Sequence, residues 1–266
     1  MMDKYCFSSR DNVRLLSIIY LSVLHFFFPT FQVFLLGTSW AFIQICMGNV
    51  KRVPKTPLAL YSIRMTLYFL PYIVPSVIMR AVAEKPCVVE ETNGYVFTIG
   101  FAVVLVTYFI WLGCNLKRIR ILMSKDYAIG AKYIEKSSII LMLYTMIGAA
   151  LCEEMFFRKY LLSVDAPMYV ILPTSVCLFV LAHWTLPWGG VYRKSDLINE
   201  VLIGIVNGVL FLVTKTAIWG MILHLLINLT TNANLFLLYD RWHLRKGYYD
   251  QVEIASEQII SDELEL

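Results

Sequence analysis

The chain has 266 residues, of which 59% are hydrophobic and only 16% are charged, and its formal net charge is +4. Soluble domains carry about a quarter charged residues, so this composition excludes an ordinary water-soluble protein and predicts a membrane protein. The small positive charge is better explained by the placement of basic loops than by a polyanionic ligand, and we expect no nucleic-acid partner.

Apolar runs close to the length that crosses a bilayer, about 20 residues, recur along most of the chain. They predict an all-α, polytopic transmembrane helix bundle with about eight spans. The first two runs are separated only by the sequence around Pro29, so one broken element, and a total of seven, stays open. The predicted spans are 14–29, 31–48, 58–80, 94–114, 137–163, 168–184, 197–213 and 216–238.

The charges of the loops predict the orientation, because short loops rich in lysine and arginine stay on the cytoplasmic side. Segments 49–56 and 115–136 are basic, whereas 83–93 carries one lysine and three glutamates. The first two are therefore expected inside and the third outside. Alternation along the chain then places the loop 187–196 and the tail from Asp240 inside. With a hairpin between the first two spans, both termini of this multi-pass cell-membrane protein are predicted to be cytoplasmic.

The sequence contains no internal repeat, low-complexity tract or second soluble domain. We therefore expect residues 1–266 to form a single membrane domain. Residues 1–136 contribute the N-terminal spans, residues 137–238 the catalytic core and residues 239–266 a tail.

The fifth span places three charged residues, Glu153, Glu154 and Arg158, in the otherwise apolar stretch GAALCEEMFFRKYLL. On an α-helix, Glu154 and Arg158 are four residues apart, lie on one face and can form an ion pair. Glu153 is turned about 100° around the same helix. This spacing predicts that Glu154 and Arg158 stabilise the structure while Glu153 stays available. Taken alone, such a pair is as typical of a clamp between helices as of a catalytic site.

Two further spans carry polar side chains at helical spacing. Phe179 and His183 are four apart in FVLAHW, and His224 and Asn228 are four apart in HLLIN. An unpaired charge at the bilayer centre costs at least about 2.5–3.5 kcal/mol, so ionisable residues in spans face the bundle interior and pair there. We therefore expect these polar residues to share one hydrated cavity with Glu153, buried between the helices of the C-terminal half.

Such a set of residues is suited to hydrolysis. A buried carboxylate can take a proton from water, and amide and imidazole N–H groups can stabilise the oxyanion that forms when that water attacks a carbonyl group. Glu153 as the base with His224 and Asn228 as oxyanion donors is one workable site. Alternatively, Glu153, His183 and His224 are a common zinc ligand set. Both mechanisms need the same residue types, so zinc stays open as a cofactor.

The patterns EExxxR, FxxxH and HxxxN, in this order on successive spans, resemble the three motifs of the CPBP family. These are the CAAX-protease and bacteriocin-processing membrane endopeptidases, also called the Abi family, which include the type II CAAX prenyl endopeptidases. The resemblance covers about residues 137–230. Other intramembrane proteases fit less well, because the chain has no HExxH, no GxSG serine after its HxxxN and no GxGD aspartate pair.

The resemblance implies an intramembrane endopeptidase, either of the glutamate type or a zinc metalloprotease. We favour the metal-free form, in which Glu153 activates water beside His183 while His224 and Asn228 form the oxyanion hole. The supporting residues implied are Glu154, Arg158 and Phe179.

The expected partners are the lipid bilayer and a membrane-associated peptide or lipidated protein as substrate. A prenylated CAAX tail, a bacteriocin leader and a membrane-anchored signalling peptide are all compatible with the sequence. The alternative to an enzyme is a non-catalytic scaffold or a bacteriocin self-immunity protein.

A transport pathway is a third hypothesis, because Glu200 and Asn207 lie seven residues apart on one face of the seventh span. We prefer the interpretation in which Asn207 makes a helix contact beside Gly204 and Gly208, since small residues allow close helix packing. Glu200 then reaches the membrane interface.

Overall fold

The computed structural model describes residues 9–49, 58–82, 94–124, 126–127, 136–184 and 194–240. Within these ranges every regular element is helical, which confirms the all-α fold. The helices are α1 (Ser9–Phe27), α2 (Phe31–Asn49), α3 (Leu58–Val82), α4 (Gly94–Leu122), α6 (Lys136–Glu154), the short helices η1 (Met155–Tyr160) and η2 (Leu161–Ser163), α7 (Met168–Trp184), α8 (Lys194–Thr214) and α9 (Ile218–Asp240).

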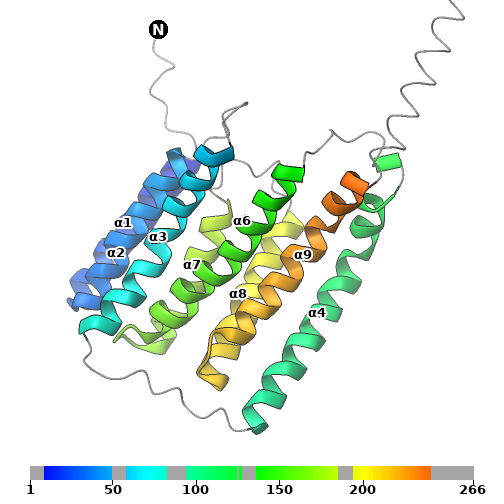
Figure 1. Cartoon of the computed structure of the whole chain (residues 1–266). Helices are drawn as coiled ribbons and strands as arrows, with labels where there is room; N and C mark the ends of the chain where they lie inside the picture. Colours follow the sequence, from blue (N-terminus) through cyan, green and yellow to red (C-terminus); the bar gives the residue numbers. More distant parts are fainter. Residues whose placement is uncertain are drawn as a thin grey trace, which may run out of the picture.

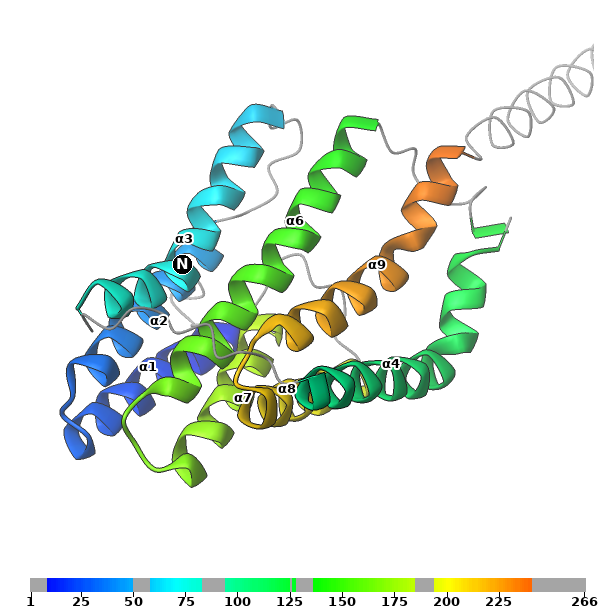
Figure 2. The ribbon, with the colours of Figure 1, turned by 60° about the horizontal axis from the view of Figure 1, so that its bottom comes forward.

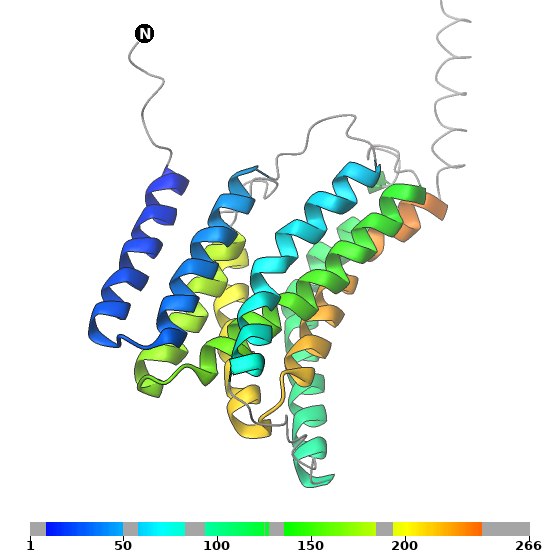
Figure 3. The same ribbon diagram turned by 60° about the vertical axis from the view of Figure 1, so that its left-hand side comes forward.

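The break around Pro29 separates two helices. Proline lacks a backbone N–H, which disfavours a continuous helix across this position. The Thr30 hydroxyl then accepts a hydrogen bond from the backbone N–H of Val33 at 3.2 Å, as a residue at a helix start does. As a result α1 and α2 pack against each other as a hairpin, which Figure 3 shows at one edge of the molecule. The predicted hairpin is confirmed and the single broken element is wrong.

Four helical stretches in the described part of the chain are long and apolar enough to cross a membrane. They are Met65–Val82, Gly94–Leu122, Ile139–Ser163 and Leu197–Thr214. Shorter apolar helices lie in α1, α2 and α7. Large apolar side chains such as Phe26 and Tyr169, each 81% exposed, cover the outside of the bundle, as a lipid-facing surface requires.

These features confirm a membrane protein, while the count of eight crossings stays a prediction. The segments 50–57, 83–93, 185–193 and 241–266, on which most of the predicted orientation depends, lie outside the described residues. The cytoplasmic placement of both termini therefore also stays a prediction.

The α4 helix is longer than the predicted span 94–114 and ends at Leu122. Its 29 residues correspond to about 43 Å, which exceeds the hydrocarbon thickness of about 30 Å. The exposed Lys117 and Arg120, expected in a loop, therefore lie on the last turns of this helix. Helix formation continues here because no glycine or proline interrupts the sequence after Gly113.

The order of the helices in space differs from their order in the chain. Figure 1 shows α1, α2 and α3 on one side, α4 on the other, and α6, α7, α8 and α9 between them. The α3 helix packs against α6, whereas α4 lies against α8 and α9. Figure 2 shows α6 and α9 side by side in the middle of the bundle. The N-terminal helices therefore flank α6, α7, α8 and α9, of which α6, α7 and α9 carry motif residues.

An aromatic cluster fixes the segment that follows the two glutamates. Trp40, Tyr72, Phe156 and Phe157 are all fully buried, and their rings meet edge to face with centroids 5.1–6.4 Å apart. The indole N–H of Trp40 donates to the hydroxyl of Ser17 at 2.8 Å. This cluster joins α1, α2, α3 and η1 and holds η1 against the N-terminal half.

Trp40→Ala is expected to destabilise the protein by about 3 kcal/mol, because it opens a cavity in this cluster and removes the donor to Ser17. The midpoint of thermal unfolding in detergent would report the loss. Phe42→Ala is the matched control on the same helix, because Phe42 is 62% exposed to lipid. Equal effects of the two variants would contradict the assigned packing.

Candidate active site

The EExxxR motif lies at a change of helix type. The α6 helix ends at Glu154, and the chain continues as the π-helix η1 and then the short 3₁₀ turn η2. The predicted span 137–163 is present as the helical stretch Ile139–Ser163, but its helix type changes after Glu154. A π-helix has a wider turn than an α-helix, and such segments occur frequently at functional sites. Here the wide turn lies between Glu154 and the rest of the motif, and Arg158 remains within reach of Glu154.

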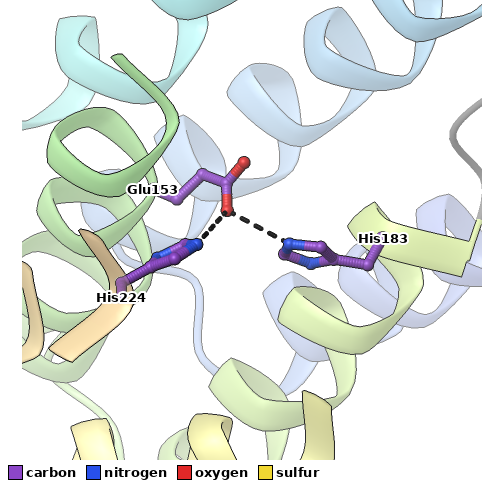
Figure 4. A group of neighbouring side chains, drawn as sticks. All are labelled: Glu153, His183 and His224. Atoms are coloured by element: carbon purple, nitrogen blue, oxygen red, sulfur yellow. Dashed lines mark ion pairs between the residues drawn. The ribbon is translucent and has the colours of Figure 1, made fainter. Parts of the chain in front are cut away.

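Glu153, His183 and His224 come together from α6, α7 and α9. One carboxylate oxygen of Glu153 lies 3.5 Å from Nε2 of His183 and 4.0 Å from Nε2 of His224 (Figure 4). Glu153 and His224 are almost completely buried, and the side chain of His183 is 17% exposed. The structure thus brings together these three residues, as the sequence predicted.

Phe179 orients His183 and forms a wall of the site. The carbonyl oxygen of Phe179 lies 2.9 Å from Nδ1 of His183, and since a carbonyl can only accept, Nδ1–H is the donor. A neutral His183 then directs the lone pair of Nε2 toward Glu153. The buried Phe179 ring also contacts the rings of His183 and His224, with centroid distances of 4.5 and 5.9 Å. This explains the spacing of the FxxxH motif.

Glu154 and Arg158 form the predicted ion pair. Nε of Arg158 lies 3.2 Å from Oε2 of Glu154, and both side chains are fully buried. The guanidinium also donates to the hydroxyl of Ser175 at 2.9 Å, and Ser175 donates to the carbonyl of Phe157 at 2.6 Å. Its carbon Cζ lies 4.8 Å from the centroid of the Phe179 ring, within cation–π range. Arg158 therefore connects η1 to α7.

The second oxygen of Glu154 has two partners on other helices. Oε1 lies 3.0 Å from Nδ2 of Asn207 on α8 and 3.2 Å from Nδ1 of His224 on α9. Asn207 makes the expected helix contact, and the partner of its amide is the motif glutamate Glu154. In the sequence, Asn207 is visible as a lone amide in an apolar run. Helical periodicity does not show which neighbouring helix such a side chain faces.

Glu200 also approaches the site. Its carboxylate lies 3.9 Å from Nε2 of His183, and its side chain is 22% exposed. The expectation that it only reaches the membrane interface is wrong, since it faces the same imidazole nitrogen as Glu153. Ser175 and Gly220 were also missed by the sequence analysis. Each lies one helical turn before a motif residue, Phe179 or His224, but neither residue type is distinctive in a membrane helix.

Asn228 follows His224 on the same face of α9. It is half-buried on α9, one turn beyond His224, and its side chain has no hydrogen-bond partner among the described residues. Its backbone carbonyl accepts from the amide of Asn232 at 2.8 Å. Its oxyanion role stays a prediction.

The centre of the site holds one carboxylate oxygen and two imidazole nitrogens. Oε2 of Glu153 is buried and has no hydrogen-bond partner in the described part of the chain. One ligand atom from each of Glu153, His183 and His224 lies within 4.8 Å of the others. Two imidazole nitrogens and a carboxylate oxygen are ligand types that zinc takes, and they can equally hold a polarised water. The residues therefore fit both forms of the predicted chemistry.

A membrane bundle of helices with a buried carboxylate facing two imidazoles has the composition of an intramembrane hydrolase site. Residues 135–230 match the family model described as type II CAAX prenyl endopeptidase Rce1-like. The matched segment contains all three motifs, and the match supports the resemblance to the CAAX-protease family that those motifs indicated. No curated protein and no solved structure matches the chain.

Glu154→Gln is expected to destabilise the protein by about 3–5 kcal/mol, because it leaves Arg158 as an uncompensated buried charge. Chemical unfolding in detergent would measure the change. Glu200→Gln serves as the control, because Glu200 is partly exposed and has no arginine within ion-pair distance among the described residues. An unchanged stability of Glu154→Gln would contradict the role of the pair.

Proposed function

We propose that the protein is an intramembrane endopeptidase that cleaves a membrane-associated peptide or lipidated protein, with Glu153 as the base that activates water. The observation that carries the proposal is the approach of the Glu153 carboxylate to Nε2 of both His183 and His224 inside the bundle. The family of the matched segment supports it.

Glu153 is suited to the role of base because its neighbour takes the structural one. Arg158, Asn207 and His224 all bond to Glu154, whereas Oε2 of Glu153 has no hydrogen bond within the described residues. A carboxylate without donors can accept a proton from a water molecule. His183, oriented by the Phe179 carbonyl, can accept the other hydrogen bond of that water through Nε2.

The reaction then follows the chemistry of peptide hydrolysis. The water oxygen forms a bond to the carbonyl carbon while its proton passes to Glu153, and the carbonyl oxygen becomes an oxyanion. The C–N bond then breaks, and the amine leaves with the proton that Glu153 held. We propose that Asn228 and the doubly protonated form of His224 donate to the oxyanion, which stabilises the transition state.

Zinc fits the same residues, with Glu153, His183 and His224 as the ligands. When bound there, it would supply a Lewis acid and a water that ionises near neutral pH. In that case the interaction of Glu154 with Nδ1 of His224 would orient a ligand, as partners of ligating histidines do. We favour the metal-free form, in which the carboxylate alone activates the water.

The substrate class follows from where the site lies. The three residues are buried among membrane helices, so a peptide must reach them from the bilayer or its surface. A prenylated CAAX tail fits this requirement and the family, and a bacteriocin leader or a membrane-anchored signalling peptide fits the location.

Glu153→Gln is expected to lower the rate of peptide cleavage by about 10²–10⁴-fold, because glutamine cannot take a proton from water. The measurement is mass spectrometry of new peptide termini in membranes with the wild-type or the variant protein. A second assay would use protein in liposomes with a farnesylated CAAX peptide and its unlipidated form. Asp165→Asn is the control, since Asp165 is exposed on the turn before α7. Equal cleavage by wild type and Glu153→Gln would contradict the proposal and favour the non-catalytic scaffold or self-immunity role.

Treatment with a strong zinc chelator is expected to leave the cleavage rate in liposomes unchanged. The reason is that the proposed water activation needs only the Glu153 carboxylate. The same preparation, assayed after dialysis and after addition of zinc, provides the control. Loss of cleavage that zinc restores would assign the metal-dependent mechanism to the same three residues.

A further inference from the structure

The side-chain amide of Asn207 is buried against two hydrogen-bond acceptors. Its Nδ2 lies 3.0 Å from Oε1 of Glu154 and 3.4 Å from the carbonyl oxygen of Gly220. Asn207 is 1% exposed, and its Oδ1 has no partner among the described residues. The orientation of a side-chain amide is assigned from its hydrogen-bonding neighbours. Because both neighbours can only accept, the NH₂ group faces them.

The two oxygens of Glu154 have different partners, an ion pair at Oε2 and a hydrogen bond at Oε1. Oε2 faces the guanidinium of Arg158 at 3.2 Å, and Oε1 accepts from Asn207. Nδ1 of His224 lies 3.2 Å from the same Oε1. A carboxylate that is paired with a guanidinium and accepts an amide N–H has no hydrogen to give, so the hydrogen between Glu154 and His224 belongs to Nδ1. The lone pair of a neutral His224 is then on Nε2, 4.0 Å from Glu153.

Gly220 makes room for this arrangement. It lies one turn before His224 on the same face of α9. A Cβ atom at this position would lie 2.8 Å from Oε2 of Glu154 and 3.3 Å from Cγ of Asn207. Because Gly220 has no side chain, α9 can approach α8 closely. The Gly220 carbonyl then contacts Asn207, and the His224 ring contacts Glu154.

We propose that Asn207 is a positioning residue that acts through Glu154 to keep the proton of neutral His224 on Nδ1 and its lone pair directed at Glu153. The catalytic consequence rests on the proposed function. His224 can then offer an N–H to an oxyanion only in its doubly protonated form. In its neutral form it accepts a hydrogen bond from the catalytic water or binds a metal ion through Nε2.

The proton position can be measured without any substrate. The protein has four histidines, so ¹⁵N-histidine labelling in lipid nanodiscs gives few signals, and His224→Gln assigns the one that matters. The spectra are recorded over a pH series so that the neutral ring is observed. In the wild type, we expect His224 to show a protonated Nδ1 and an unprotonated Nε2. A neutral His224 with the proton on Nε2 would overturn the proposal.

Two variants test the link through Glu154. Asn207→Leu removes the donor at nearly constant volume, and Gly220→Ala displaces Glu154 while Asn207 stays intact. Both are expected to raise the fraction of His224 with the proton on Nε2. They should also lower kcat by about 10- to 100-fold, as changes to the partners of site residues do, with little change in KM. Because the spectra need no cleavage, a wild type without protease activity would refute the proposed function and still leave this proposal measurable.

Asn199→Leu is the matched control on α8. Asn199 also makes an amide contact between helices, to Asn115 at 3.5 Å, but does not touch Glu154. It is expected to leave the His224 signal unchanged. If Asn207→Leu lowers kcat no more than this control, or leaves the proton of His224 on Nδ1 as in the wild type, the positioning role is wrong. Should Asn207→Leu fail to insert, the wild-type spectrum and Gly220→Ala decide the same question.

Discussion

The carboxylate of Glu154 is the charge around which the helices of the C-terminal half are arranged. A fully buried ion costs several kcal/mol unless donors surround it, and the bilayer interior offers no water to supply them. Three donors from three elements meet this need: Arg158 on η1, Asn207 on α8 and His224 on α9. Moving any of these elements away would leave a buried charge unpaired. The requirement of one side chain therefore determines how η1, α8 and α9 meet.

This arrangement separates the roles of two adjacent glutamates. Glu154 is ion-paired with Arg158 and hydrogen-bonded through Oε1, whereas Oε2 of Glu153 lies 3.5 and 4.0 Å from the Nε2 atoms of His183 and His224. The two imidazoles are oriented from behind, one by the Phe179 carbonyl and the other by Glu154. Neighbouring residues thus stabilise the fold and form the candidate site. The motif spans the end of α6 and the start of η1, where the chain changes to a π-helix.

Much of the site was predictable because it depends on short-range geometry. The four-residue spacing of Glu154 and Arg158 predicted their ion pair, and the energetic cost of polar groups in a bilayer predicted that Glu153, His183 and His224 converge. The partners of Asn207 and Glu200 were not predicted, because hydropathy and periodicity identify the face of a helix but not the helix that it meets. Gly220 was missed for the same reason, because a glycine in a sequence does not indicate which neighbouring side chain lies where its own side chain would be.

The sequence by itself determined that the protein lies in a membrane, which segments are helical and which residues form the three motifs. Composition and helical periodicity are properties of single segments. Only the tertiary structure decided that α4 lies against α9 while α6 packs between α3 and α9, and that Glu154 shares His224 with Glu153. The physical reason is that hydrogen bonds between side chains on different helices depend on how the helices pack, which no single segment specifies.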